Sequence, residues 1–463
     1  MQGPEVAERA SVGRSEQNQR SVDFISLLRF FIPLAIVPLM IASIHSVTNA
    51  GLARMPAPEV TLAVFGVVKG ITNAVKSPDL MITQMAVSLV DDGRSFRLLV
   101  RFSLMLGAVL LIILALMGYT PLGGWLLKNV IGLTDETEIA FAYTALRITC
   151  FLPVSEILRN SFHGVLIGLK QTSIMPVATT IRLALIIAFI AFAIATRAVS
   201  GMFVGGFTWT AGIGVEGIVL LIYITIRFGS PLKAVAKIPD KNRPSLAMKD
   251  MVRFFMPLGL MALIASWLHP MVQAALVRMS LIPTLTLASY EVAFGLIMIL
   301  SGPVRLLHHC AIVYVTSLKD PNWPYIVRFC IGVGVACSVA TLLTGVTPLG
   351  EFLMGDVIGA PDHIVEKAKL ALTGATLLPL AHAIRESYWG ILMRYRSTKV
   401  IGIAKGLNFA ATAVSLIVLA TVFGRMGLEP AVIGVLAVTT GELAESALVI
   451  RTTLKDRLLY SSS

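Results

Sequence analysis

The motif Arg-Phe-Phe-Ile-Pro-Leu at residues 29–34 returns with a single change as Arg-Phe-Phe-Met-Pro-Leu at residues 253–258. His45 follows the first copy at the same spacing as His269 follows the second. Further pairs with small register shifts are Pro78 with Pro303, Pro153 with Pro379, Arg159 with Arg385, and Gly164 with Gly390. Chance similarity between apolar segments would match Leu and Val rather than Pro, Arg, His and Gly. The chain therefore contains two copies of one sequence unit.

The chain is too apolar for a soluble protein, because 56% of its residues are hydrophobic and only 14% are charged. Soluble domains carry about 25% charged residues. A membrane span needs about 20 apolar residues, and about twelve segments meet that need. They are residues 24–50, 60–89, 98–117, 139–168, 174–196, 202–226, 252–276, 284–316, 326–344, 366–393, 399–423 and 431–450. The sequence therefore predicts an all-α polytopic membrane protein with 12 transmembrane helices in two six-helix bundles. Because an even number of spans separates the two copies, the bundles are parallel and related by a pseudo-twofold axis.

Charges in the loops predict the orientation and the domains. Lys and Arg gather in alternate loops, including residues 94–101 and the linker 228–249, whereas the opposite loops hold acidic residues. By the positive-inside rule, both termini are cytoplasmic. The predicted domains are an N-terminal cytoplasmic tail (1–22), an N-terminal bundle (23–227), the basic linker (228–249), a C-terminal bundle (250–451) and a C-terminal tail (452–463). No cleavable signal is evident, and we expect a monomer in the plasma (inner) membrane.

These features resemble the multidrug/oligosaccharidyl-lipid/polysaccharide (MOP) exporter superfamily, which includes the MATE pumps and the lipid-linked glycan flippases. Within it, the Arg-Phe-x-x-Pro-Leu motif, Gly302-Pro303, the segment 313–317 (Val-Tyr-Val-Thr-Ser) and the stretch 164–172 are similar to the progressive ankylosis protein family. The chain departs from that family in lacking a long acidic C-terminal tail. The resemblance implies export of small anions such as ATP, citrate and pyrophosphate.

Ionisable residues inside the spans are the candidates for function, because a charge in a bilayer needs a partner or a water-filled cavity. Lys76 and Arg305 flank the paired prolines, and Arg159 and Arg385 are repeat equivalents. The pseudo-twofold axis is expected to bring these four cations together in a cavity that binds anions. The candidate substrate-binding residues are Lys76, Arg159, Arg305, Arg385, Lys69, Glu156, Glu386 and His382.

Other interpretations of these residues stay open. Glu156 and Glu386 lie close in sequence to Arg159 and Arg385, so the arginines can instead form structural ion pairs within their own halves. The candidates for proton or ion coupling are His45, His269, Glu291 and His309, and a structural hydrogen bond is the alternative for each histidine. Pro78 and Pro303 are candidate hinges, with static kinks as the alternative.

The sequence favours a secondary transporter that exports small anions by rocker-switch alternating access through a cationic central cavity. The alternatives are a flippase for lipid-linked oligosaccharides, a cation-coupled multidrug efflux pump, and a membrane enzyme or scaffold without transport. No phosphate-binding loop or catalytic motif is found in the sequence, so we expect no enzyme activity, cofactor or metal site. The expected partners are a small anionic substrate, the lipid bilayer and a coupling ion, but no nucleic acid.

Overall fold

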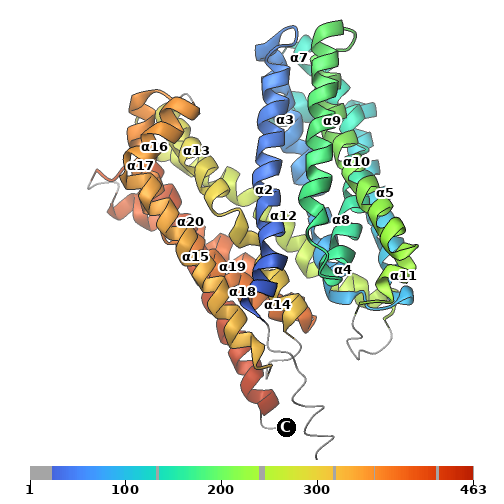
Figure 1. Cartoon of the computed structure of the whole chain (residues 1–463). Helices are drawn as coiled ribbons and strands as arrows, with labels where there is room; N and C mark the ends of the chain where they lie inside the picture. Colours follow the sequence, from blue (N-terminus) through green and yellow to red (C-terminus); the bar gives the residue numbers. More distant parts are fainter. Residues whose placement is uncertain are drawn as a thin grey trace, which may run out of the picture.

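The computed structural model describes residues 23–131, 135–238, 246–315, 320–358, 360–423 and 427–461. These residues are almost entirely helical (Figure 1). The first half contains α2 (Phe24–Leu52), α3 (Pro58–Lys76), α4 (Met81–Leu89), α5 (Gly93–Tyr119), α6 (Pro121–Trp125), α7 (Glu136–Thr149), α8 (Leu152–Gly168), α9 (Ile174–Thr196), α10 (Gly201–Phe228) and α11 (Pro231–Val235). The second half contains α12 (Met248–Met279), α13 (Pro283–Leu300), α14 (His308–Tyr314), α15 (Asn322–Val346), α16 (Pro348–Glu351), α17 (Asp362–Gly374), α18 (Leu378–Arg394), α19 (Thr398–Val422) and α20 (Pro430–Ser461).

The predicted all-helical membrane fold is confirmed. Among the described residues, 9 helices are long and apolar enough to span a membrane, or 10 if the bent pair α13–α14 counts as one span. The remaining two predicted spans are the interrupted pairs α3–α4 and α17–α18. The predicted domain boundaries stay predictions. The N-terminal tail, residues 239–245 of the linker and residues 462–463 of the C-terminal tail lie outside the described residues.

Equivalent spans in the two halves are interrupted at their prolines. Pro78 lies in a 3₁₀ turn, η1 (Ser77–Leu80), between α3 and α4. Pro303 starts a 3₁₀ turn, η3 (Pro303–Leu306), and the helices on its two sides are bent by 48°. Proline lacks the N–H that would continue an α-helical ladder, which explains both interruptions. Movement at these positions stays a prediction.

The duplication is also visible in backbone geometry. Lys170 and Arg396, which follow the repeat-equivalent helices α8 and α18, both have a left-handed backbone, with φ of 59° and 58°. In both places the next residue closes the helix end: Gln171 N–H donates to the Leu166 carbonyl, and Ser397 N–H donates to the Leu392 carbonyl. The same end motif at equivalent positions indicates that the two halves share their local structure as well as their sequence.

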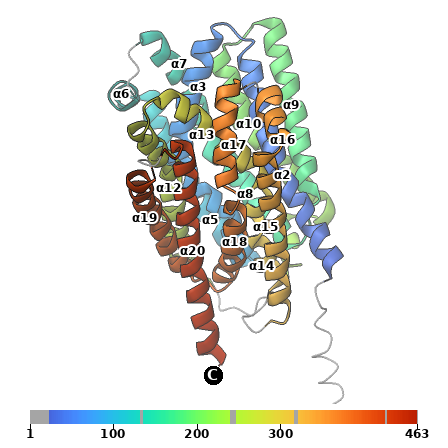
Figure 2. The same cartoon turned by 90° about the vertical axis from the view of Figure 1, so that its left-hand side faces the viewer.

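The buried apolar side chains form three clusters, and their distribution determines where the halves meet. One cluster combines both halves, from Leu27 and Met85 in the first to Leu258 and Cys330 in the second. The other two clusters belong to one half each, around Leu146 and around Leu372. The C-terminus and α14 lie at the end with the shared cluster, and α7 lies at the opposite end (Figures 1 and 2). The halves are therefore joined at one end and have separate cores at the other.

The repeated hexapeptide supplies the aromatic contacts at the joined end. Phe31 on α2 meets Phe329 on α15 edge to face, with 5.5 Å between ring centroids. Phe255 on α12 meets Phe102 on α5 edge to face at 4.9 Å. Each contact joins the first span of one half to the third span of the other half. The two contacts are thus the same pair, repeated by the pseudo-twofold symmetry.

Candidate functional site

A cavity lies where the two halves meet. Its volume is about 470 Å³, which is within the range of small-molecule sites. Its wall takes residues from α2, α4, α8 and α9 of the first half and from η3, α14 and α18 of the second. The charged and histidine side chains on this wall are Arg159, His163, Arg305, His308, His309 and Glu386. We call this space the central cavity.

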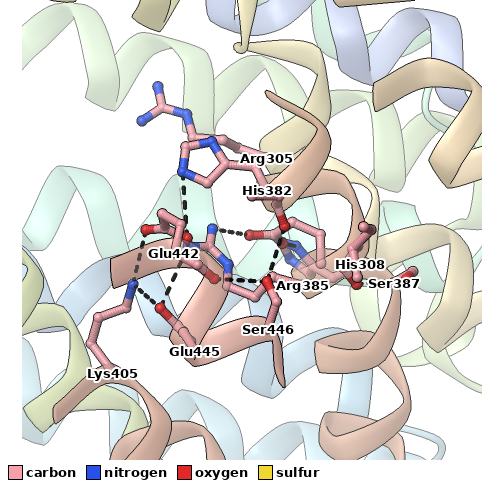
Figure 3. A network of polar contacts seen from close by, with 12 residues as sticks. Arg305, His308, His382, Arg385, Ser387, Lys405, Glu442, Glu445 and Ser446 are labelled. Atoms are coloured by element: carbon pink, nitrogen blue, oxygen red, sulfur yellow. Dashed lines mark hydrogen bonds and ion pairs between the residues drawn. The ribbon is translucent and has the colours of Figure 1, made fainter. Parts of the chain in front are cut away.

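Arg305 is the exposed cation of the central cavity. It sits in the 3₁₀ turn after Pro303, so the interruption of the helix places its side chain at the wall. Its Nη1 lies 3.6 Å from the Met298 sulfur, and it makes no ion pair with a described residue. The guanidinium stands apart from the neighbouring ion pairs (Figure 3). Its positive charge is thus available to a ligand in the cavity.

Arg385 is held by carboxylates of its own half. Its Nη2 lies 2.6 Å from Glu386 Oε1 on the same helix, and its Nη1 contacts Glu442 on α20. Lys405 on α19 joins this group at 2.6 Å from Glu445 (Figure 3). Since all these side chains are buried, each charge is compensated locally.

Arg159 has a comparable but looser set of partners in the first half. It lies 4.0 Å from both Glu156 on α8 and Glu216 on α10. Glu156 is bound by Lys76 at 2.7 Å, and Glu216 is bound by Arg182 at 3.0 Å. This network therefore links α3, α8, α9 and α10 within one bundle.

Sequence reasoning named Glu156 and Glu386 but missed the other carboxylates of the two networks. Glu216 and Glu442 lie in the sixth and twelfth spans, and the spacing between them is the same as that between Arg159 and Arg385. Extending the repeat comparison to the last span of each half would have found this arginine–glutamate pair. It would not have found Arg182 and Lys405, which occupy different positions of α9 and α19.

The structure divides the predicted substrate-binding residues. Arg159, Arg305 and Glu386 line the central cavity, whereas Lys76, Lys69, Glu156, Arg385 and His382 do not. Of the four cations expected to meet in one cavity, only Arg159 and Arg305 lie on its wall, and their role in substrate binding stays a prediction. Lys76 and Arg385 are bound to carboxylates behind the wall, because the low dielectric of a helix bundle favours close compensation of buried charge.

The predicted coupling residues lie in three different places. His309 is on the wall of the central cavity, with its ring 4.1 Å from that of His308. His269 pairs with Glu291 at 3.0 Å in the second half. His45 lies 3.3 Å from Lys69 in the first half. His163 on the cavity wall was not predicted, and it lies 3.4 Å from Glu216.

Comparisons with known proteins agree with this architecture. Residues 236–456 match the family model of the progressive ankylosis protein. A crystal structure of a MATE point mutant superposes with a TM-score of 0.77 at 12% identity, covering 95% of this chain and 97% of that one. An outward-facing multidrug resistance MATE transporter of the MOP superfamily superposes with a TM-score of 0.74 at 12% identity, covering 95% of this chain and 96% of that one. A MOP superfamily transporter from Pyrococcus furiosus superposes with a TM-score of 0.72 at 13% identity, covering 93% of this chain and 95% of that one. The chain has the fold of these transporters, and the predicted resemblance to the progressive ankylosis family is confirmed over its second half.

Proposed function

We propose that this multi-pass membrane protein, similar over its second half to the progressive ankylosis protein family, exports small anions through the central cavity. The observation that carries this proposal is Arg305, a cation that faces the cavity without a carboxylate partner among the described residues. Arg159 and three histidines share the wall, and Glu386, the acidic side chain there, is engaged by Arg385 and His308. Such a surface concentrates anions and repels organic cations.

The chemistry of the wall favours phosphates and carboxylates. A guanidinium presents a planar fork of donors that matches two oxygens of either group. The cavity volume accommodates a compact polyanion, and ATP, pyrophosphate and citrate are the candidates that the family resemblance suggests. A multidrug pump for cations would need carboxylates to dominate the wall. The Pyrococcus furiosus relative is described as having a binding pocket of reverse polarity that suggests a different function, so pocket charge varies on this fold.

Alternating access is the mechanism we propose. In the present arrangement the halves share a core at one end and have separate cores at the other, and we propose that the central cavity opens toward the end with separate cores. Rocking the halves about the cavity would exchange the joined and separated ends. The basic residues around 94–101 lie at the joined end, so under the positive-inside rule this arrangement faces outward. We place both termini in the cytoplasm of the cell and the protein in its plasma (inner) membrane.

The test is transport by the purified protein in proteoliposomes, with labelled ATP, pyrophosphate, citrate and an organic cation. Arg305→Gln removes a charge-assisted hydrogen bond of about 2 kcal/mol, so we expect KM for the anion to rise about 30-fold. Arg101→Gln makes the same charge change at an exposed position of α5 and should leave KM unchanged. Anion transport by Arg305→Gln at the unaltered KM would refute the proposal, and transport of the organic cation alone would favour a drug pump.

A further inference from the structure

A second, smaller pocket lies inside the first half between α2, α3, α9 and α10. Its polar lining is His45, Thr48, Asn49, Lys69, Arg182 and Trp209. None of its lining residues belongs to the wall of the central cavity. We call it the lysine pocket, after Lys69. It is a separate site with its own chemistry.

The lysine pocket is rich in hydrogen-bond donors. Lys69 brings an ammonium group, Asn49 an amide and Trp209 an indole N–H, and no carboxylate is on the lining. Arg182 is 1% exposed, and its Nε has no hydrogen-bond partner in the described structure. A buried N–H without an acceptor lowers the stability of the fold. An acceptor bound in the pocket that Arg182 lines would remove this cost.

The charge of Lys69 is not compensated by the protein. Arg182 forms an ion pair with Glu216, with 3.0 Å between Nη1 and Oε2. Lys69 contacts His45 at 3.3 Å, and Lys69 forms no ion pair with a described side chain. The second half differs at the corresponding place. There the equivalent histidine, His269, has a carboxylate, Glu291, at 3.0 Å. The first half thus has a cation where the second half carries its own anion.

The size of the lysine pocket limits what can enter. Its volume is about 10 Å³, compared with about 470 Å³ for the central cavity. A space of this size holds one water or one monatomic ion. Organic anions and polyphosphates are too large, so the occupant is not the substrate of the central cavity.

We propose that the lysine pocket binds one halide ion, which in the cell is chloride, between Lys69 and Arg182. An anion there accepts the free Arg182 N–H and supplies the counter-charge that Lys69 lacks, whereas a water does only the first. Trp209 connects this site to the buried network, since its ring also lies 5.9 Å from the ammonium of Lys76. The ion therefore helps to fix the arrangement of α3 against α9.

The experiment measures binding directly on the purified full-length protein, without transport. Bromide stands in for chloride, and it quenches the fluorescence of a tryptophan that it contacts. We expect a saturable quench in the unmodified protein that chloride competes away and gluconate does not. Trp209→Phe should remove the saturable part. Lys69→Gln should weaken bromide binding at least tenfold, while Lys128→Gln, an equal charge change in an exposed ion pair, should not alter it.

A crystallographic bromide soak of the unmodified protein gives an answer even if a variant fails to fold. An anomalous peak between Lys69 and Arg182 supports the proposal. Water density at that place with no anomalous signal, or a quench that rises linearly and equally in the unmodified protein and Lys69→Gln, overturns it. These readouts do not depend on what the central cavity carries, so failure of the anion-export proposal would leave them unaffected.

Discussion

The two cross-half aromatic contacts provide a test of how the joined end is held. Phe31 and Phe255 occupy the same position of the repeated hexapeptide, and each meets an aromatic ring of the other half. Replacing both by leucine keeps most of the apolar area but removes both edge-to-face contacts. The perturbation therefore acts on the contact between halves and leaves the interior of each half intact.

The expected magnitude follows from these two contacts. An edge-to-face pair contributes about 0.5–1.5 kcal/mol beyond its buried area. Loss of both pairs should therefore cost the joined state about 2 kcal/mol. If rocking exchanges the two ends, the population in which this end is open rises about 30-fold, since each 1.4 kcal/mol is a factor of about ten.

Native cysteines report this opening, so no engineered cysteine is needed. Cys330 is fully buried in the shared cluster beside Phe329, and Cys150 is 1% exposed within the first half. A water-soluble maleimide reacts with a buried thiol in proportion to its open population when reclosing is fast. Peptide mass spectrometry of the labelled protein separates the two sites. We expect about 30-fold faster labelling of Cys330 in Phe31→Leu/Phe255→Leu, and unchanged labelling of Cys150.

A matched substitution controls for the loss of an aromatic ring alone. Phe203 and Phe207 stack at 5.5 Å within the first half, so Phe203→Leu removes an aromatic contact that does not cross between halves. It should leave Cys330 labelling unchanged. The reasoning is refuted if Phe203→Leu accelerates Cys330 as much as the double variant does. It is also refuted if Cys150 accelerates together with Cys330, because the whole bundle would then have loosened.

Two further substitutions, Gly390→Ala with Gly406→Ala as its control and Asp92→Ala, test local packing and capping by thermal unfolding of the purified protein. A Cβ added at Gly390 would lie 2.5 Å from the His308 carbonyl oxygen, so Gly390→Ala should destabilise by about 1–3 kcal/mol; Gly406 has no atom within 4 Å, and Gly406→Ala should be neutral or slightly stabilising. Equal effects of the two alanines would contradict the close helix approach. Asp92 caps α5 by accepting from Ser95 N–H at 2.6 Å, and Asp92→Ala should cost about 1 kcal/mol at neutral pH. Hydrogen bonds from Ser95 lower the pKa of Asp92, so the advantage of the unmodified protein over this variant should hold above about pH 4 and shrink as the pH falls further; a constant difference would argue against the charged cap.

Several features of the fold followed from the sequence because they depend on local rules. Apolar length identified the spans, and paired prolines identified where the second and eighth spans are interrupted. The repeat gave the relation between the halves, and the structure extends it to the aromatic contacts of Phe31 and Phe255. The ends of α8 and α18, at Lys170 and Arg396, repeat as well.

The candidate site was predicted less completely, because compensation between charges depends on which helix faces are adjacent. The sequence placed Arg305 and Arg159 among the substrate-binding candidates, and both line the central cavity. It also grouped Lys76 and Arg385 with them, although both are bound to carboxylates behind the wall. Burial of a charge is set by neighbours that are far apart in the chain, and periodicity does not reveal them.

The sequence by itself determined that the chain is a duplicated helical membrane protein with cations in its spans. Hydrophobic length, the positions of prolines and internal repetition are properties of the chain alone. Only the tertiary structure decided which cations are free. Glu216 and Glu442, from the last span of each half, reach the arginines of the fourth and tenth spans. Arg305 faces the central cavity and Lys69 the smaller lysine pocket, neither with a carboxylate partner among the described residues.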